Sequence, residues 1–235
     1  MFSAALQNAI FSRRLAVEAV DPLAASVVLY ARFNGTNGST TLVDESIVGR
    51  TLTAVGDAQL STSSPLRGAS SLLLAGAGYV DIAASASLDL GTNPFCVEFL
   101  INTSTFSLDG GVQRTVLALG NYNDAAGLAI CFYAGAASSN ISVFTNAQIV
   151  TGTIPAADGS THHVALDRSG TTMKLFVDGV QSASVSNSQN YNSAASNAAR
   201  IGAGRFDNAS GRLIGKLDEL KITRASRYQS AFTPP

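Results

Sequence analysis

The feature that most constrains the fold is a set of short alternating segments in the last third of the chain. Residues 162–168, 173–177 and 180–185 mix apolar and polar positions at the period of two that is typical of half-buried β-strands. Asp178-Gly179 separates the last two segments, and these residue types accept the positive φ that a type I′ turn needs at both positions. The sequence therefore predicts antiparallel hairpins here.

Similar runs, separated by Gly, Asn, Asp and Ser clusters, recur along most of the chain. No helical pattern of comparable length interrupts them, which argues against a parallel α/β fold. At 235 residues the chain fits one large all-β domain, and we predict an antiparallel β-sandwich. The predicted strands are residues 27–33, 51–55, 71–74, 79–82, 95–102, 115–119, 128–133, 141–144, 162–168, 173–177, 180–185, 200–202 and 213–223, with one long loop at 186–198.

The first 23 residues differ from the rest, because apolar residues recur there every four positions, the spacing of a helical stripe. Asp21-Pro22 would end such a helix and open the globular part. We therefore divide the chain into an N-terminal anchoring arm, residues 1–23, and a sandwich domain, residues 24–235. The residues expected to anchor the arm in an assembly are Phe2, Leu6, Ile10 and Phe11.

Charge and hydropathy argue against two classes of partner. Charged residues make up 13% of the chain and the net charge is −1, without the basic stripe that nucleic-acid binding requires. No apolar run approaches the roughly 18 residues of a membrane-spanning helix. Arg13 and Arg14 follow the first apolar stretch rather than precede it, which argues against a cleavable export signal.

Cys96 and Cys131 each lie in an apolar, strand-like run. Two buried thiols are the favoured interpretation, because a buried Cys behaves as a small apolar residue. A bridge between neighbouring strands stays open as the alternative.

Glycoside hydrolysis is the enzymatic activity to test, because it needs two carboxylates about 5–5.5 Å apart for retention of configuration. The chain has four glutamates, and Glu98 is followed by Leu100 and Asn102 where partner acids on the same strand face would lie. Asp218 and Glu219 are adjacent, so strand geometry would direct them to opposite faces. The same holds for the two histidines, His162 and His163. We therefore predict no catalytic residues and no enzyme.

Calcium is the one cofactor that the sequence leaves open, since hard cations bind clustered oxygen ligands in loops. Two polar loops offer such oxygens, each with one carboxylate, and solvated turns are the alternative interpretation. The aromatic residue in each loop could stack on a sugar or contact a neighbouring protein. The candidate ligand or calcium loops are Asn121, Tyr122, Asn123 and Asp124, and Phe206, Asp207 and Asn208.

Several motifs resemble the laminin-G-like domains of the concanavalin A-like lectin/glucanase superfamily. They are Thr-His-His-Val-Ala at 161–165, Leu-Phe-Val-Asp-Gly at 175–179, Arg-Ile-Gly at 200–202 and Gly-Lys-Leu-Asp-Glu-Leu-Lys-Ile at 215–222. Phe-Cys-Val-Glu-Phe-Leu-Ile-Asn at 95–102 is similar to the strand that opens the core of such domains. The resemblance covers residues 27–235 and implies a jelly roll. The end of the chain, Arg227-Tyr228 followed by Phe-Thr-Pro-Pro at 232–235, is similar to modules on bacteriophage structural proteins.

From this resemblance we expect a non-enzymatic virion structural protein, assembled in the host cytoplasm: a capsid decoration, head-fibre or tail-associated subunit. Its expected partners are other virion proteins or copies of itself, in a homo-oligomer within a larger assembly, with host glycans at the sandwich loops. A secreted or cell-surface carbohydrate-binding lectin module is the alternative, and a glycan-active hydrolase is a third.

Overall fold

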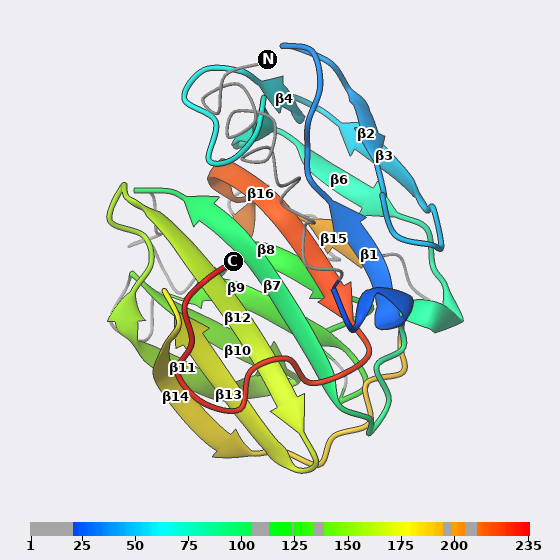
Figure 1. Cartoon of the computed structure of the whole chain (residues 1–235), viewed down its shortest axis with the longest axis vertical. Coiled ribbons are helices and arrows are strands. Elements are labelled where there is room, and N and C mark those ends of the chain that lie inside the picture. Colours follow the sequence, from blue (N-terminus) through cyan, green and yellow to red (C-terminus); the bar gives the residue numbers. More distant parts are fainter. Residues whose placement is uncertain (1–20, 105–112, 124, 134–138, 195–198, 205–210) are drawn as a thin grey trace, which may run out of the picture.

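The computed structural model describes residues 21–104, 113–123, 125–133, 139–194, 199–204 and 211–235. In these residues, two antiparallel sheets lie face to face as a β-sandwich (Figure 1). The predicted all-β sandwich is therefore confirmed. Two short 3₁₀ turns lie wholly within the described part, η1 (Ala24–Ser26) and η2 (Ala86–Leu88), and no helix there has the length and apolarity to cross a membrane.

Sheet A faces the viewer in Figure 1 and has eight strands in the described part of the chain. In spatial order these are β14 (Val180–Ser186), β13 (Thr172–Val177), β12 (Thr161–Ser169), β7 (Phe95–Asn102), β16 (Ile214–Thr223), β5 (Ser71–Ala75) and β4 (Gln59–Ser61), with β1 (Val27–Ala31) paired to β16.

Sheet B lies behind it and also has eight strands among the described residues. Their order is β11 (Ala147–Pro155), β10 (Asn140–Thr145), β9 (Leu128–Tyr133), β8 (Gln113–Leu119), β15 (Ala199–Ile201), β6 (Tyr79–Ile82), β3 (Thr51–Val55) and β2 (Thr41–Val43).

The core lies between the sheets and is supplied by alternate residues of each strand. On β7, Phe95, Val97, Phe99 and Ile101 are completely buried in it. The residues between them face outward, so Glu98 belongs to the outer face of sheet A. The strand period thus decides which polar side chains can form a site.

The turn between β13 and β14 has the predicted conformation, with φ of 51° at Asp178 and 76° at Gly179. The favoured interpretation of the two cysteines is also confirmed, because both thiols are buried and free. Cys96 lies on the outer side of sheet A and Cys131 on the outer side of sheet B. Burial raises the pKa of both thiols.

A buried arginine holds the long loop that follows β14. Arg168 is completely buried and lies over the rings of Phe95 and Tyr191, at 4.9 and 5.1 Å from the ring centroids. Its guanidinium donates four hydrogen bonds of 2.6–3.2 Å to carbonyl oxygens. The acceptors are Gly91, Asn93 and Gln189. The described part of the predicted loop, residues 187–194, is therefore tied to the fold.

The chain after β16, residues 224–235, forms an extended strap across the outer face of sheet A (Figure 1). It passes over β7, β12 and β13 and contacts side chains of all three strands. This C-terminal strap covers part of the outer face of sheet A, so it limits which side chains of that face are accessible.

Candidate functional site

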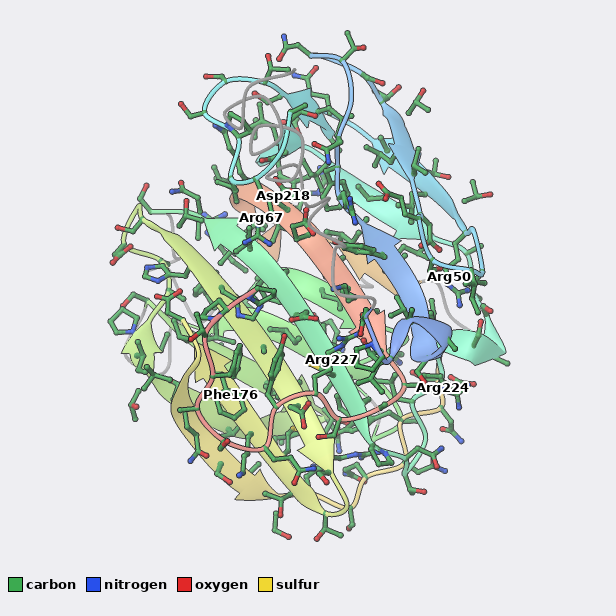
Figure 2. All side chains as sticks on the ribbon, viewed as in Figure 1. Arg50, Arg67, Phe176, Asp218, Arg224 and Arg227 are labelled. Atoms are coloured by element: carbon green, nitrogen blue, oxygen red, sulfur yellow. The ribbon has the colours of Figure 1, made fainter. Side chains whose placement is uncertain are left out.

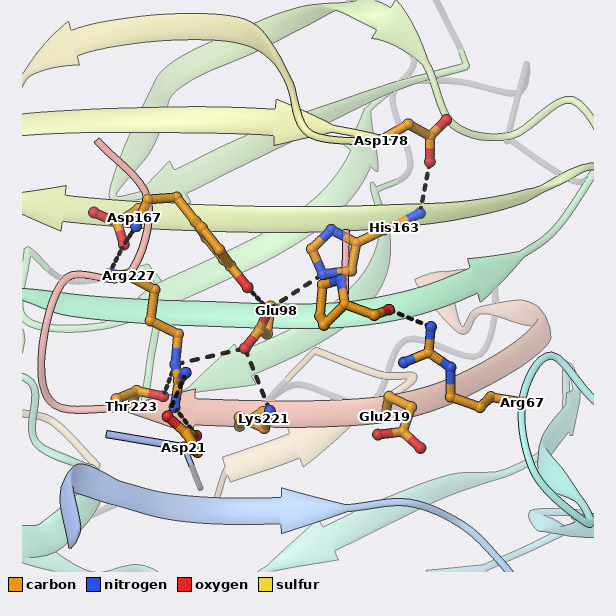
Figure 3. A network of polar contacts seen from close by, with 12 residues as sticks. Asp21, Arg67, Glu98, His163, Asp167, Asp178, Glu219, Lys221, Thr223 and Arg227 are labelled. Carbon is orange, nitrogen blue, oxygen red and sulfur yellow. Dashed lines mark hydrogen bonds and ion pairs between the residues drawn. The ribbon is translucent and has the colours of Figure 1, made fainter. Parts of the chain in front are cut away.

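The outer face of sheet A carries a buried charge cluster beneath the C-terminal strap (Figure 3). Its centre is Glu98, which is 3% exposed. One carboxylate oxygen accepts a hydrogen bond from Tyr228 Oη at 2.6 Å and lies 3.2 Å from His163 Nε2. The other lies 3.7 Å from Lys221 Nζ and 3.6 Å from Arg227 Nε. Glu98 therefore has polar partners from β12, β16 and the strap.

These partners decide the protonation of the cluster. Burial alone would raise the pKa of Glu98, but the contacts with His163 and Tyr228 and the charge of Lys221 lower it below its ordinary value. Burial, together with the charge of Glu98, raises the pKa of Tyr228. The glutamate is thus an ionised acceptor and the tyrosine a neutral donor.

The strap is attached through a second carboxylate, Asp167 on β12. Its oxygens accept hydrogen bonds from Ser226 Oγ at 2.6 Å, Arg227 N at 2.6 Å and Tyr228 N at 3.0 Å. Asp167 therefore anchors a segment about 60 residues away along the chain.

Aromatic packing completes the attachment of the strap. The rings of Tyr228 and Phe232 stack with centroids 3.6 Å apart, and Phe232 meets Phe176 and His163 edge-on at 5.4 and 5.7 Å. Figure 2 shows Phe176 on the near face of the sandwich beside the strap. Phe232 N also donates to the carbonyl oxygen of Gly179 at 3.0 Å. The strap is therefore part of the packed fold.

A cavity of about 60 Å³ remains at the end of this cluster, lined by residues that include Glu98, His163 and Glu219. It has room for a few water molecules but not for a sugar chain. Glu219 is hydrogen-bonded by Tyr30 Oη, and Glu98 is bonded by Tyr228. Two glutamates thus share one cavity, yet each is held by a tyrosine and neither faces an open cleft.

The prediction that Asp218 and Glu219 lie on opposite faces is wrong. The register of β16 shifts between Asp218 and Lys221, and Glu219 has a φ of 50°. This bulge breaks the alternation, so both carboxylates contact side chains of the outer face. Asp218 accepts from Ser71 Oγ at 2.8 Å, while Glu219 accepts from Tyr30. Burial raises the pKa of Asp218 to about 6.

The two histidines do point away from each other, as predicted. His163 contacts Glu98, whereas the ring of His162 lies between Asp178 and Asp158 at the rim, at 2.7 and 3.0 Å. Burial opposes a charge on His162, but its hydrogen bonds to the two aspartates raise its pKa overall. His162 is hydrogen-bonded through both ring nitrogens, whereas His163 is bonded through Nε2 and its buried Nδ1 has no hydrogen-bond partner.

The outer face of sheet B carries an aromatic patch, which we define as Tyr122, Tyr133 and Phe144. The rings of Tyr133 and Phe144 meet edge to face at 4.9 Å, and all three side chains pack around buried small residues of β8 and β9. Tyr122 and Tyr133 are partly exposed. Tyr133 and Phe144 were missed by sequence reasoning, although both occupy outward positions of strands that were predicted correctly.

Tyr122 belongs to the first of the two predicted ligand loops. Its carbonyl oxygen accepts a hydrogen bond from Asn146 N at 2.6 Å, which fixes the loop against the β10–β11 turn. A Cβ on Gly204 would lie 2.7 Å from Tyr122 Oη. Gly204, the last described residue before the second predicted loop, therefore lies beside Tyr122.

One contact among the described residues bears on the predicted calcium site. The Asn121 side-chain oxygen accepts a hydrogen bond from Asn123 N at 3.2 Å, as in a solvated Asx turn. Within the described ranges, no three His, Cys, Asp or Glu side chains are grouped to hold a metal ion. Asp124, Phe206, Asp207 and Asn208 lie outside the described residues, as do the arm residues Phe2, Leu6, Ile10 and Phe11. Calcium binding and arm anchoring therefore stay predictions.

Solved structures with a similar fold include the binding domain of Paraclostridial Mosquitocidal Protein 1, with a TM-score of 0.65 and 14% identity over 87% of this chain and 50% of that chain. A structure of botulinum neurotoxin type C, whose cell entry depends on two ganglioside molecules, has a TM-score of 0.60 and 12% identity over 87% of this chain and 49% of that chain. This chain thus spans about half the length of these toxin chains.

Domain 4 of a GH43 extracellular arabinanase from Geobacillus stearothermophilus, solved with arabinotriose, is similar over nearly its whole length. The TM-score is 0.60 and the identity 14%, over 86% of this chain and 93% of that domain. At such identities, these likenesses show the fold alone.

Among curated protein sequences, none matches this chain. A family model described as the concanavalin A-like lectin/glucanases superfamily matches residues 74–230, which is more than half of the sequence. The laminin-G-like motifs and the two-sheet sandwich agree with that match. The chain therefore belongs to the concanavalin A-like lectin/glucanase superfamily.

Proposed function

We propose that this protein is a non-catalytic glycan-binding module and that the aromatic patch on sheet B is its sugar-binding surface. The observation that carries the proposal is the arrangement of two partly exposed tyrosines: Tyr133 lies on a rigid strand of sheet B, and Tyr122 lies on the fixed polar loop beside it. Aromatic rings bind the C–H face of a sugar, while nearby amide groups hydrogen-bond its hydroxyls.

The similar structures support a binding role. Two are toxin chains, of which one is described as a binding domain and the other as dependent on gangliosides. The third is domain 4 of an arabinanase and was solved with arabinotriose. Since this chain matches that domain over nearly its whole length, a module of this size is sufficient for an oligosaccharide.

The carboxylates of sheet A support the non-catalytic part of the proposal. A glycosidase places two carboxyl groups on either side of a bound glycosidic bond. Here Glu98 and Glu219 line a cavity of about 60 Å³ under the strap, and each accepts a hydrogen bond from a tyrosine. Their role is to hold the strap and β1 in place.

The test is retention of the protein on immobilised glycans that include arabinan oligosaccharides and ganglioside head groups. We expect selective retention of at least one glycan class and no release of product on prolonged incubation. Failure to retain any glycan would contradict the binding role, whereas product release would contradict the non-catalytic part.

We further propose that the module is a structural subunit of a virion, attached through its N-terminal arm. The resemblance of residues 227–235 to bacteriophage modules supports this, as does the apolar stripe of Phe2, Leu6, Ile10 and Phe11. We expect that deletion of residues 1–20 leaves a folded domain that no longer joins the particle. Normal incorporation of the deletion variant, or display of the intact protein on a cell surface and not on particles, would contradict this role.

A further inference from the structure

An apolar patch is exposed at the edge of the sandwich formed by β2. Of the four large apolar side chains that the described residues expose strongly, three lie within six positions: Val43 at 55%, Ile47 at 78% and Val48 at 44%. β2 is the last strand of sheet B in the described part of the chain. Clustered exposure of this kind marks an interaction surface more often than scattered apolar residues do.

The loop that presents this patch is fixed by a buried carboxylate. Asp44, 6% exposed, accepts hydrogen bonds from the backbone N–H groups of Tyr30, Ser46 and Arg50 at 2.8–2.9 Å. Arg50 Nε in turn donates to the carbonyl oxygen of Val28 at 2.8 Å. Ile47 and Val48 are therefore held outward by a preorganised loop, so a partner would bind them at little cost in conformational entropy.

A groove of about 240 Å³ lies beside the patch. Tyr30, Val27 and Ile47 supply its apolar surface, and Arg32 and Glu45 are among its charged lining residues. This volume is below the roughly 300–1,000 Å³ of pockets that enclose small-molecule ligands. It suits one or two apolar side chains of a peptide segment.

The chain itself brings such a segment to the groove. Asp21 lines the groove, and a hydrogen-bonded ion pair with Arg227 at 2.7 Å holds it there. Residues 1–20 therefore join the described fold at the edge of the groove. Eleven residue-to-residue steps separate Ile10 from Asp21 and span up to about 36 Å when extended, so Ile10 and Phe11 are able to reach Ile47. Attachment to the same chain also gives them a high effective concentration.

We propose that the groove beside β2 is a docking site for the apolar stripe of the chain's own N-terminal segment, with Ile10 and Phe11 as the side chains closest to Ile47 and Tyr30. Docking in cis covers Ile47 and shields the stripe until an assembly partner competes for it. This inference does not depend on glycan binding.

Limited proteolysis of the whole chain tests the proposal, because trypsin can cleave after Arg13 and Arg14. Ile47→Asp places a charge in the groove, and it should leave the fold intact because Ile47 is 78% exposed. Val180→Asp is the matched control: Val180 is 55% exposed and lies on β14, at the other end of sheet A. We expect cleavage at Arg13 and Arg14 to be at least ten-fold faster in Ile47→Asp and unchanged in Val180→Asp. Equal rates in all three proteins would overturn the proposal.

A photo-crosslinker in place of Ile10 locates the docking site directly. Mass spectrometry should find adducts on residues 43–48 or on Tyr30. A mixture of isotope-labelled and unlabelled protein separates the two possible arrangements. Crosslinks within one chain support docking in cis, while crosslinks between chains, or only to other surfaces, contradict it.

Discussion

Arg227 and Asp21 join the two ends of the described chain: the guanidinium donates two hydrogen bonds to the carboxylate, at 2.7 and 3.1 Å. The same guanidinium lies 3.6 Å from the buried Glu98. One side chain therefore links the start of the domain, the strap and the charge cluster of sheet A (Figure 3). The hydrogen bonds from Arg227 also lower the pKa of Asp21.

Arg227→Ala should lower the free energy of unfolding by about 2 kcal/mol, because it removes two hydrogen bonds to Asp21 and one of the two cations beside the buried Glu98. The control is Arg32→Ala, which breaks the exposed Arg32–Glu45 pair, 3.4 Å apart, and should cost less than about 1 kcal/mol. Denaturant unfolding measures both. Equal losses in the two variants would contradict the role assigned to Arg227.

Gly179→Ala should detach the strap. A Cβ there would lie 1.8 Å from the carbonyl oxygen of Phe232, whereas a Cβ on Gly170 meets nothing within 4 Å. Both glycines have positive φ, at 76° and 57°, so Gly170→Ala isolates the backbone cost of about 1 kcal/mol. We expect Gly179→Ala to cost at least about 2 kcal/mol more and to expose residues 224–235 to proteases. A difference below 0.5 kcal/mol, about the uncertainty of such comparisons, would mean that the strap adjusts freely.

Glu98 makes stability depend on pH in the acid range. Its pKa is lowered in the folded state, so it stabilises the protein above the unfolded-state value of about 4.3, and the effect is lost as the pH falls through the folded pKa. Glu98→Gln should be less stable at neutral pH and should lose less stability on acidification. Unfolding curves at pH 7 and pH 3 provide the measurement, and parallel pH profiles of the two proteins would refute the assignment.

Asp218 changes the stability with pH in the direction opposite to Glu98. Its pKa is raised to about 6, so the folded state binds the proton more tightly and stability falls as the pH rises from about 4 to about 6. In Asp218→Asn this part of the pH profile should disappear, while the loss below pH 4 caused by Glu98 remains. A variant that keeps the wild-type slope between pH 4 and pH 6 would show that another group titrates there.

The strands could be predicted largely because their alternation is local. Residues 51–55, 79–82, 95–102 and 128–133 have the predicted bounds. The structure adds β2, β4 and β11. β2 and β4 have three residues each, and β11 mixes Gln, Thr, Gly and Pro without a clear period. Short or irregular strands are stabilised by their neighbours and not by local pattern.

The charge cluster could not be predicted, because its members are far apart along the chain. Glu98 and Tyr228 are separated by 130 residues, and no local spacing relates them. The bulge at Glu219 could not be predicted for another reason. A positive φ at a non-glycine residue depends on its tertiary surroundings, and the alternation of the strand alone predicts the wrong face for the Glu219 side chain. Of the aromatic patch, only Tyr122 was predicted, because it lies in a polar loop that the sequence pattern identifies.

The affinity of the aromatic patch for a glycan tests the central claim most directly. Titration of the best-retained glycan should show at least a ten-fold weaker Kd for Tyr133→Ala, about 1.4 kcal/mol, with Tyr133→Phe within two-fold of the wild type because it keeps the ring. Tyr30→Ala, a half-buried tyrosine of the opposite sheet, is the control and should bind as the wild type does. Unchanged affinity in a folded Tyr133→Ala, or equal losses in Tyr133→Ala and Tyr30→Ala, would contradict the account.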